Sequence, residues 1–235
     1  MYVEPTNADV VNCPYIKGEK FRQRYTVLKE LTSNDFDHLL INGWRHFGYY
    51  FFMPNCSNCS SCTPIRTVIE EFKPSKSQRR NLKKNINTTV EIQDLIYSDE
   101  IYEIYKKHSH DKFNQDSSKK DFKESFFADA LSGNSKLSLY KVDSKLVGVG
   151  FIDISNEGIS SIYFCYDTDF SHLGLGVYSV LKEIEYANEL GKSYYYLGYY
   201  IEGNGSMEYK AKYKPYETLS WDRACWIPFK ELSIV

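Results

Sequence analysis

The chain has 235 residues, with 29 Lys and Arg against 31 Asp and Glu, which gives a formal net charge of −2. This balance excludes a uniformly basic, histone-like binder, so any contact with nucleic acid has to come from a local patch. No apolar run reaches the roughly 20 residues that span a bilayer, and the N-terminus has neither the basic start nor the apolar stretch of a secretory signal. We therefore expect a cytoplasmic protein without membrane contact, whose six cysteines are thiols or metal ligands.

The first part of the chain predicts short elements on either side of a cysteine loop. Thr32 and Ser33 are good N-cap residues and Asn42-Gly43 is a good stop, which predicts a short helix between them. An aromatic run follows and is typical of a strand. In chain order, the expected elements are an extended or irregular segment over 1–31, a helix over 35–41, a strand within 43–52 and a strand over 65–72.

Four cysteines form a candidate metal site. Three stand at CxxCxxC spacing in the loop and the fourth lies near the N-terminus; they are Cys56, Cys59, Cys62 and Cys13. Four thiolates are enough for a structural zinc ion or an iron–sulfur cluster. A loop of reduced thiols that packs without metal is the alternative, and the spacing does not choose between metals.

A basic run follows the cysteine loop. Between Lys73 and Lys84 there are six Lys or Arg and no acid. Ser75 is a good N-cap, so the run predicts a cationic helix. A solvated helix face and an RNA contact both explain such a run.

The rest of the chain predicts two helices, a set of strands with period-two patterning, and a final helix and strand. Their expected ranges are helices over 98–113 and 118–131, strands over 137–142, 146–154 and 159–166, a helix that ends near 189–191, and a strand over 194–198. A turn with Leu173, Gly174 and Gly176 opens the last helix. This order resembles the core of the GNAT acyltransferase fold, in which backbone N–H groups at such a turn suit a phosphate-bearing acyl donor. Ordinary packing of a helix on a strand explains the two glycines equally well.

Matches to one family run along nearly the whole chain. They are Cys13 with Tyr15, Gly43-Trp-Arg-His-Phe-Gly48, Cys56–Cys62 with Pro64-Ile65-Arg66, Phe72–Arg80 with Asn85, Ser160–Asp167, Tyr196–Ile201, Met207–Lys210 and Tyr213-Lys-Pro215. In these residues the chain resembles the aminoacyl-tRNA–protein transferases of the N-end rule, which comprise arginyltransferases and bacterial leucyltransferases that act on Asp and Glu N-termini. The chain departs from the family pattern at three positions. Thr168 stands where the family has Pro, Gly174 where it has Ser, and Lys107 where it has Arg.

The resemblance implies an α+β fold, with an N-terminal cysteine-bearing subdomain over 1–95 and a GNAT-like catalytic domain over 96–235. It also implies aminoacyl transfer from the ester at a tRNA 3′ end to a protein α-amine. Because the ester is already activated, the chemistry needs no cofactor, and positioning alone can supply about 7–11 kcal/mol of the barrier. The α-amine has a reference pKa of about 7.7–8.0, so a weak base or the tRNA itself suffices.

The chemistry assigns candidate residues to each task. Catalytic candidates are Asp167, His108, Lys210 and Tyr213. Candidates for binding the acceptor carboxylate are Arg66, Arg79 and Arg80, because a guanidinium binds a carboxylate in bidentate geometry. Candidates for tRNA contact are Lys83, Lys84, Tyr199, Tyr209 and Lys212. The alternatives are surface charge for the arginines, a turn cap for Asp167, and packing for His108 and the tyrosines.

Leucine is the favoured donor, because the compact chain and the Cys13-x-Tyr15 opening look bacterial, and arginine is the alternative. Two other classes stay open at this point, namely an acetyl-CoA-dependent GNAT enzyme and a metal-containing RNA-binding module. The expected partners are aminoacyl-tRNA and proteins that begin with Asp or Glu, and the expected state is a monomer.

Overall fold

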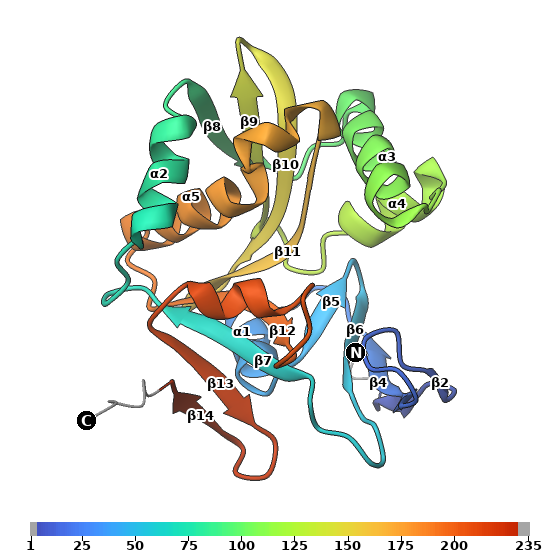
Figure 1. Ribbon diagram of the computed structural model, residues 1–235. Coiled ribbons are helices and arrows are strands. Elements are labelled where there is room, and N and C mark those ends of the chain that lie inside the picture. The colour runs from blue at the N-terminus through green and yellow to red at the C-terminus, as the bar shows by residue number, and fades with distance from the viewer. Residues whose placement is uncertain (1–3, 230–235) are drawn as a thin grey trace, which may run out of the picture.

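A computed structural model describes residues 4–229 (Figure 1). Its main element is an eight-stranded mixed sheet in the order β14-β13-β7-β12-β11-β10-β9-β8. The strands are β7 Thr63–Val68, β8 Thr88–Asp94, β9 Ser135–Val142, β10 Lys145–Ile154, β11 Gly158–Tyr166, β12 Tyr194–Tyr200, β13 Tyr216–Ser220 and β14 Cys225–Pro228. Strands from both sides of residue 95 therefore share this sheet, with β7 placed between β12 and β13.

A second sheet and a ribbon form the N-terminal part of the structure. The sheet has the order β1-β4-β6-β5, and β2 pairs with β3. Their bounds are β1 Thr6–Asn7, β2 Val11–Asn12, β3 Lys20–Phe21, β4 Gln23–Val27, β5 Arg45–Phe47 and β6 Tyr50–Pro54. The aromatic run expected as one strand is thus a hairpin, because Gly48 takes a φ of +52° and reverses the chain.

Five α-helices occur in the described residues. They are α1 Ser33–Ile41, α2 Lys76–Lys84, α3 Asp99–Phe113, α4 Lys119–Phe126 and α5 Leu175–Glu189, with short 3-10 helices η1 Thr168–Leu173 and η2 Glu208–Lys212. The expected caps are confirmed, since Thr32 and Ser75 each form a reciprocal capping box. The expected helix over 118–131 is too long, because α4 ends at Phe126. None of the helices between residues 4 and 229 is long and apolar enough to cross a membrane.

The helices cover both faces of the large sheet. Apolar residues of α5 pack with β7 and β12 in one core, whereas α3 and α4 pack on Leu137, Val149 and Phe151 from the other side. Figure 1 shows α2 beside α5, and α3 beside α4. The mixed α+β architecture expected from the chain order is present.

One place in the large sheet opens for a ligand. Strands β11 and β12 run parallel, and they pair only from Gly158–Ser160 to Tyr194–Tyr196. Both strands continue past this point, to Tyr166 and Tyr200. Their carboxyl ends are therefore no longer joined by the ladder, and this is the side on which open sheets with parallel strands bind ligands.

Candidate active site

Lys210 lies at the open end of β12. It is on η2, with only 8% of its surface exposed. Its Nζ donates a hydrogen bond to the Tyr199 carbonyl oxygen at 2.5 Å and lies 3.4 Å from Met207 Sδ. Burial, and after it the charge of nearby Arg45, lower the pKa of Lys210 to about 7.

Arg45 is a second buried cation at the same place, and the sequence analysis did not single it out as a site residue. It comes from β5 and is also 8% exposed. Its guanidinium donates to Ser160 Oγ at 2.7 Å and to the Ser161 carbonyl oxygen, just where β11 leaves the ladder. Its position in the Gly43–Gly48 family stretch was the available signal.

Gly198 separates these two cations. A Cβ at this position would lie 3.7 Å from both Arg45 Nε and Lys210 Nζ. The residue has a φ of +84° beside an irregular register between β12 and β7. A glycine therefore keeps the position between the guanidinium and the ammonium free of a side chain, and its positive φ is a conformation that glycine adopts without strain.

An apolar cavity of about 380 Å³ adjoins Lys210. Tyr199 and Met207, which both contact Lys210 Nζ, line it. No charged side chain between residues 4 and 229 lines it; the other lining residues are Pro14, Tyr15, Phe21, Gln23, Phe47, Tyr50, Phe52, Pro54, Cys62 and Ile201. The cavity therefore suits an uncharged, apolar group.

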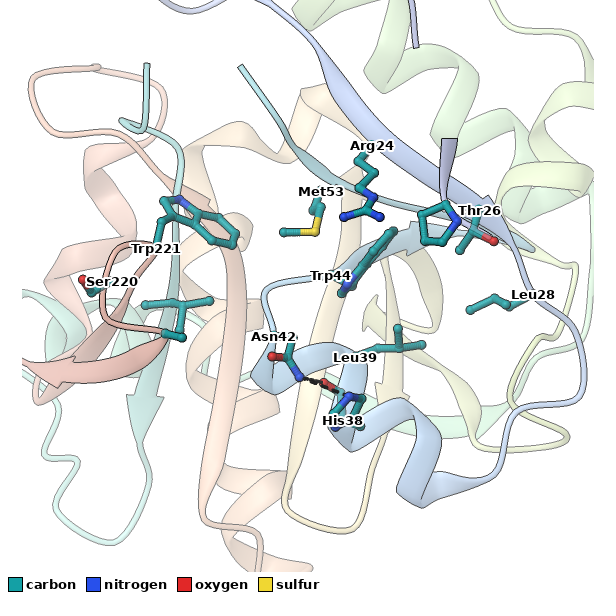
Figure 2. A pocket seen from close by; sticks show the side chains of 13 residues that line it. Arg24, Thr26, Leu28, His38, Leu39, Asn42, Trp44, Met53, Ser220 and Trp221 are labelled. Atoms are coloured by element: carbon teal, nitrogen blue, oxygen red, sulfur yellow. Dashed lines mark hydrogen bonds between the residues drawn. The ribbon is translucent and has the colours of Figure 1, made fainter. Parts of the chain in front are cut away.

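A second cavity, of about 400 Å³, lies on the opposite face of the small sheet (Figure 2). Successive side chains of a strand point to opposite faces of the sheet. In β4, Gln23 lines the first cavity and the next residue, Arg24, lines the second. Trp44 and Trp221 also line it. Neither Tyr199 nor Met207, the two residues that contact Lys210 Nζ and line the first cavity, lines this one.

The expected donor turn is held by α2. Asn81 Nδ2 donates to the Leu173 and Gly174 carbonyl oxygens, at 3.1 and 3.2 Å, and Asn85 Nδ2 donates to the former at 2.9 Å. A Cβ at Gly174 would lie 2.8 Å from Asn81 Nδ2, whereas one at Gly176 would meet nothing within 4 Å. Helix α5 has no side-chain N-cap. The Val177 N–H donates to the Gly174 carbonyl oxygen at 3.1 Å, so only the N–H groups of Leu175 and Gly176 remain for an anion in the first turn.

Asp167 and His108 lie at the end of β11. Asp167 accepts from Lys107 Nζ at 2.5 Å and Lys145 Nζ at 2.9 Å. Burial alone would raise the pKa of Asp167, but the hydrogen bonds from the two lysines outweigh it and lower the pKa. His108 is buried with Nδ1 at 3.2 Å from the Tyr166 carbonyl oxygen, and burial lowers its pKa.

The three acceptor-binding candidates are not brought together. Arg66 is buried, and its Nη2 lies 2.6 Å from Glu217 Oε2. Its guanidinium also lies 3.5 Å from the centre of the Tyr194 ring, so its charge is already compensated. Arg79 and Arg80 are exposed on α2.

The tRNA-contact candidates fall into two groups. Lys83 and Lys84 lie exposed on α2, and Lys84 Nζ donates to the His172 carbonyl oxygen beside the donor turn. Tyr199 is largely buried, with its hydroxyl 2.8 Å from the Gly43 carbonyl oxygen. Lys212, Tyr209 and the buried Tyr213 lie on or next to η2 with Lys210.

Two family models match the chain. The model described as "Arginine-tRNA-protein transferase, N terminus" matches residues 11–80, and its C-terminal counterpart matches residues 98–220. The chain belongs to the arginine-tRNA-protein transferase family. It is therefore an aminoacyl-tRNA transferase enzyme, and the hypothesis of a non-catalytic RNA-binding module is wrong.

Similar proteins agree with this family. Aspartate/glutamate leucyltransferase of Campylobacter jejuni (strain 81116) is 37% identical over 213 residues, which cover 88% of this chain and 89% of the relative. The protein of the same name from Helicobacter hepaticus is 36% identical, with 88% of each chain covered.

Solved structures confirm the expected GNAT-like fold of this transferase. L-PGS from Bacillus licheniformis superposes with a TM-score of 0.53 at 13% identity, over 83% of this chain and 67% of that one. FemX superposes with a TM-score of 0.52 at 11% identity, over 76% and 64%. At these identities the likeness concerns the fold alone.

The four cysteines of the transferase line one cavity of about 210 Å³. Cys62 is buried, and burial followed by the neighbouring thiols raises its pKa to about 11. Within residues 4–229, however, no three His, Cys, Asp or Glu side chains are arranged to hold a metal ion. The thiols do not fit a metal as they stand, and no step proposed below passes through one. A zinc ion or iron–sulfur cluster stays a prediction, which metal analysis of the purified protein checks.

Proposed function

We propose that this transferase moves leucine from leucyl-tRNA to the α-amine of proteins that begin with Asp or Glu, which marks them for N-end rule degradation. It acts as a monomer in the cytoplasm. The proposal is supported by the family, by the names of the similar leucyltransferases and by the cavity beside Lys210.

The apolar cavity is the observation that favours leucine over arginine as the donor amino acid. An isobutyl side chain gains free energy when it leaves water for an apolar cavity. An arginine side chain would bury a guanidinium there, and no described residue that lines the cavity could neutralise it. Leucine is therefore favoured over arginine.

The reaction itself needs only positioning and proton transfer. The neutral α-amine attacks the ester carbonyl carbon, so that a C–N bond forms and the C–O bond to the ribose breaks. The proton that the amine loses goes to the ribose oxygen that leaves, which balances the step without a strong base. Helix α2, with its exposed Arg79, Arg80, Lys83 and Lys84, supplies phosphate contacts beside the donor turn.

A transfer assay with total charged tRNA tests this function. Peptides that begin with Asp, Glu, Lys or Ala are incubated with the protein and analysed by mass spectrometry. We expect a leucine-sized mass gain on the Asp and Glu peptides alone. An arginine-sized gain would overturn the choice of donor, and no gain on any peptide would overturn the function.

A further inference from the structure

Arg45 and Lys210 are buried cations that no carboxylate between residues 4 and 229 contacts directly; the charge of Asp153, which is paired with His46, acts on Arg45 only from a distance. Within the described part of the chain, neither forms an ion pair with a carboxylate, although each is 8% exposed. A buried charge without a counter-ion costs several kcal/mol. The fold does supply a carboxylate where a cation is structural, since Arg66 in the same region is paired with Glu217.

The two cations lie close to one glycine, since a Cβ added at Gly198 would be 3.7 Å from both Arg45 Nε and Lys210 Nζ. Ser160 Oγ and the Ser161 carbonyl oxygen hold the guanidinium of Arg45, and the Tyr199 carbonyl oxygen holds the ammonium of Lys210. All these contacts are to uncharged oxygens, which position the cations without neutralising them. Gly198 has no side chain to fill the space between them.

We propose that Arg45 and Lys210 bind the side-chain carboxylate of the acceptor's first residue, and so select proteins that begin with Asp or Glu. This inference rests on the proposed function, and it assigns the acceptor site to residues other than Arg66, Arg79 and Arg80. A guanidinium and an ammonium on either side of one carboxylate supply charge-assisted hydrogen bonds to both of its oxygens.

The burial of the pair favours a carboxylate over a tRNA phosphate. A phosphodiester has a ribose on each side and needs an open surface, whereas a side-chain carboxylate ends its chain and can enter a narrow site. The exposed cations of α2 offer such a surface, and the Arg45–Lys210 pair does not.

The test compares peptides that begin with Asp and with the isosteric, uncharged Asn. For the wild-type protein we expect kcat/KM to favour Asp by about 100-fold, because truncating a buried, hydrogen-bonded charge pair has an effect of this size. In Lys210→Met and Arg45→Gln the ratio should fall below about 10-fold, because transfer to the Asp peptide falls more than transfer to the Asn peptide, while the KM for leucyl-tRNA changes little. Lys106→Met, at an exposed position of α3, is the matched control and should keep the wild-type ratio.

Three outcomes would overturn the inference. An unchanged ratio with a raised KM for leucyl-tRNA would assign the pair to phosphate. An equal loss of transfer to both peptides would indicate a structural role. A second test is calorimetric titration of the peptides into the protein bound to tRNA that carries no amino acid. Equal affinity of the wild-type protein for the Asp and Asn peptides would also contradict the inference. If instead the Asp peptide binds tighter and no transfer occurs, only the proposed function fails.

Discussion

Lys210 and Arg66 differ in one residue-scale feature, the presence of a carboxylate partner. Lys210 is buried beside another cation, whereas Arg66 lies 2.6 Å from Glu217. The first arrangement is expected to destabilise the free protein, whereas in the second the carboxylate offsets the cost of burying the cation. Function at the end of β12 is therefore expected to oppose stability.

Lys210→Met should therefore stabilise the substrate-free protein. The change removes a buried ammonium and keeps the length of the side chain, so we expect a gain of about 1 kcal/mol after the loss of the bond to the Tyr199 carbonyl. Arg66→Met is the matched control and should cost about 2–3 kcal/mol, because it leaves the partly buried Glu217 unpaired. Urea unfolding measures both, and a less stable Lys210 variant would contradict the expectation.

Gln23→Glu should change the preference for the donor. Gln23 lines the apolar cavity, and its Nε2 donates to the Tyr50 hydroxyl at 2.6 Å. A carboxylate of equal size there should lower kcat/KM for leucyl-tRNA by about 10-fold or more, and raise the use of arginyl-tRNA. Gln115→Glu, at an exposed position, adds the same charge as a control. An unchanged kcat/KM for leucyl-tRNA would show that the cavity does not bind the donor side chain.

Glu183 should make stability depend on pH. It is fully buried under the large sheet with Ser138 Oγ at 2.8 Å, and burial raises its pKa from 4.5 to about 7. The unfolded chain therefore releases this proton at lower pH than the folded protein. A contribution of about 3 kcal/mol, present below pH 4.5, is lost as the pH rises to about 7. In Glu183→Gln, unfolding free energies at pH 5 and pH 7 should differ less than in the wild-type protein; parallel profiles would contradict this.

At the scale of elements, the hairpin of β5 and β6 places Arg45 in the candidate site through a turn that the sequence did not predict. Gly48 lets the chain reverse, and β5 then carries Arg45 to β11. The same turn packs on α4, since a Cβ at Gly48 would lie 2.2 Å from the Glu124 carbonyl oxygen. The hairpin therefore has no room for any side chain at this position.

Gly48→Ala should be strongly destabilising. Gly203 has a similar positive φ of +75°, but a Cβ added there would meet nothing within 4 Å, so Gly203→Ala isolates the backbone strain. We expect about 1 kcal/mol for Gly203→Ala and at least about 3 kcal/mol for Gly48→Ala, where overpacking adds to the strain. Thermal unfolding compares the two, and equal losses would show that α4 moves aside.

Local signals in the sequence predicted most elements and pointed to Lys210, but they did not single out Arg45. Thr32 and Ser75 cap their helices through contacts three residues away, so the sequence alone identifies them. The turn at Gly48 lies inside an aromatic run, where apolar residues on both sides hide it. Nothing local distinguishes Arg45 from Arg66 either; the difference is Glu217, which only the pairing of β7 with β13 brings near Arg66.

At the scale of the whole molecule, the large sheet joins the two segments that the family models match. Strand β7 belongs to the N-terminal match and pairs on both sides with strands of the C-terminal match. Neither segment can complete its own sheet, because each would leave a ladder of unpaired backbone groups.

The protein should therefore unfold in a single cooperative transition. Differential scanning calorimetry measures this as a ratio of calorimetric to van't Hoff enthalpy close to one. The ratio should stay the same in Gly203→Ala, which lowers stability without touching the sheet. Two resolved transitions would instead support independent subdomains over 1–95 and 96–235.

The position of β7 also sets the order of events during synthesis. Thr67 pairs with Tyr195 on one side and with Tyr216 on the other, so this early strand leaves the ribosome long before either neighbour exists. Lys210 lies in the segment that connects those two late strands. The candidate active site consequently forms only after β13 has been synthesised, and a nascent chain that ends before β12 would have no activity, because its central strand would still lack both partners.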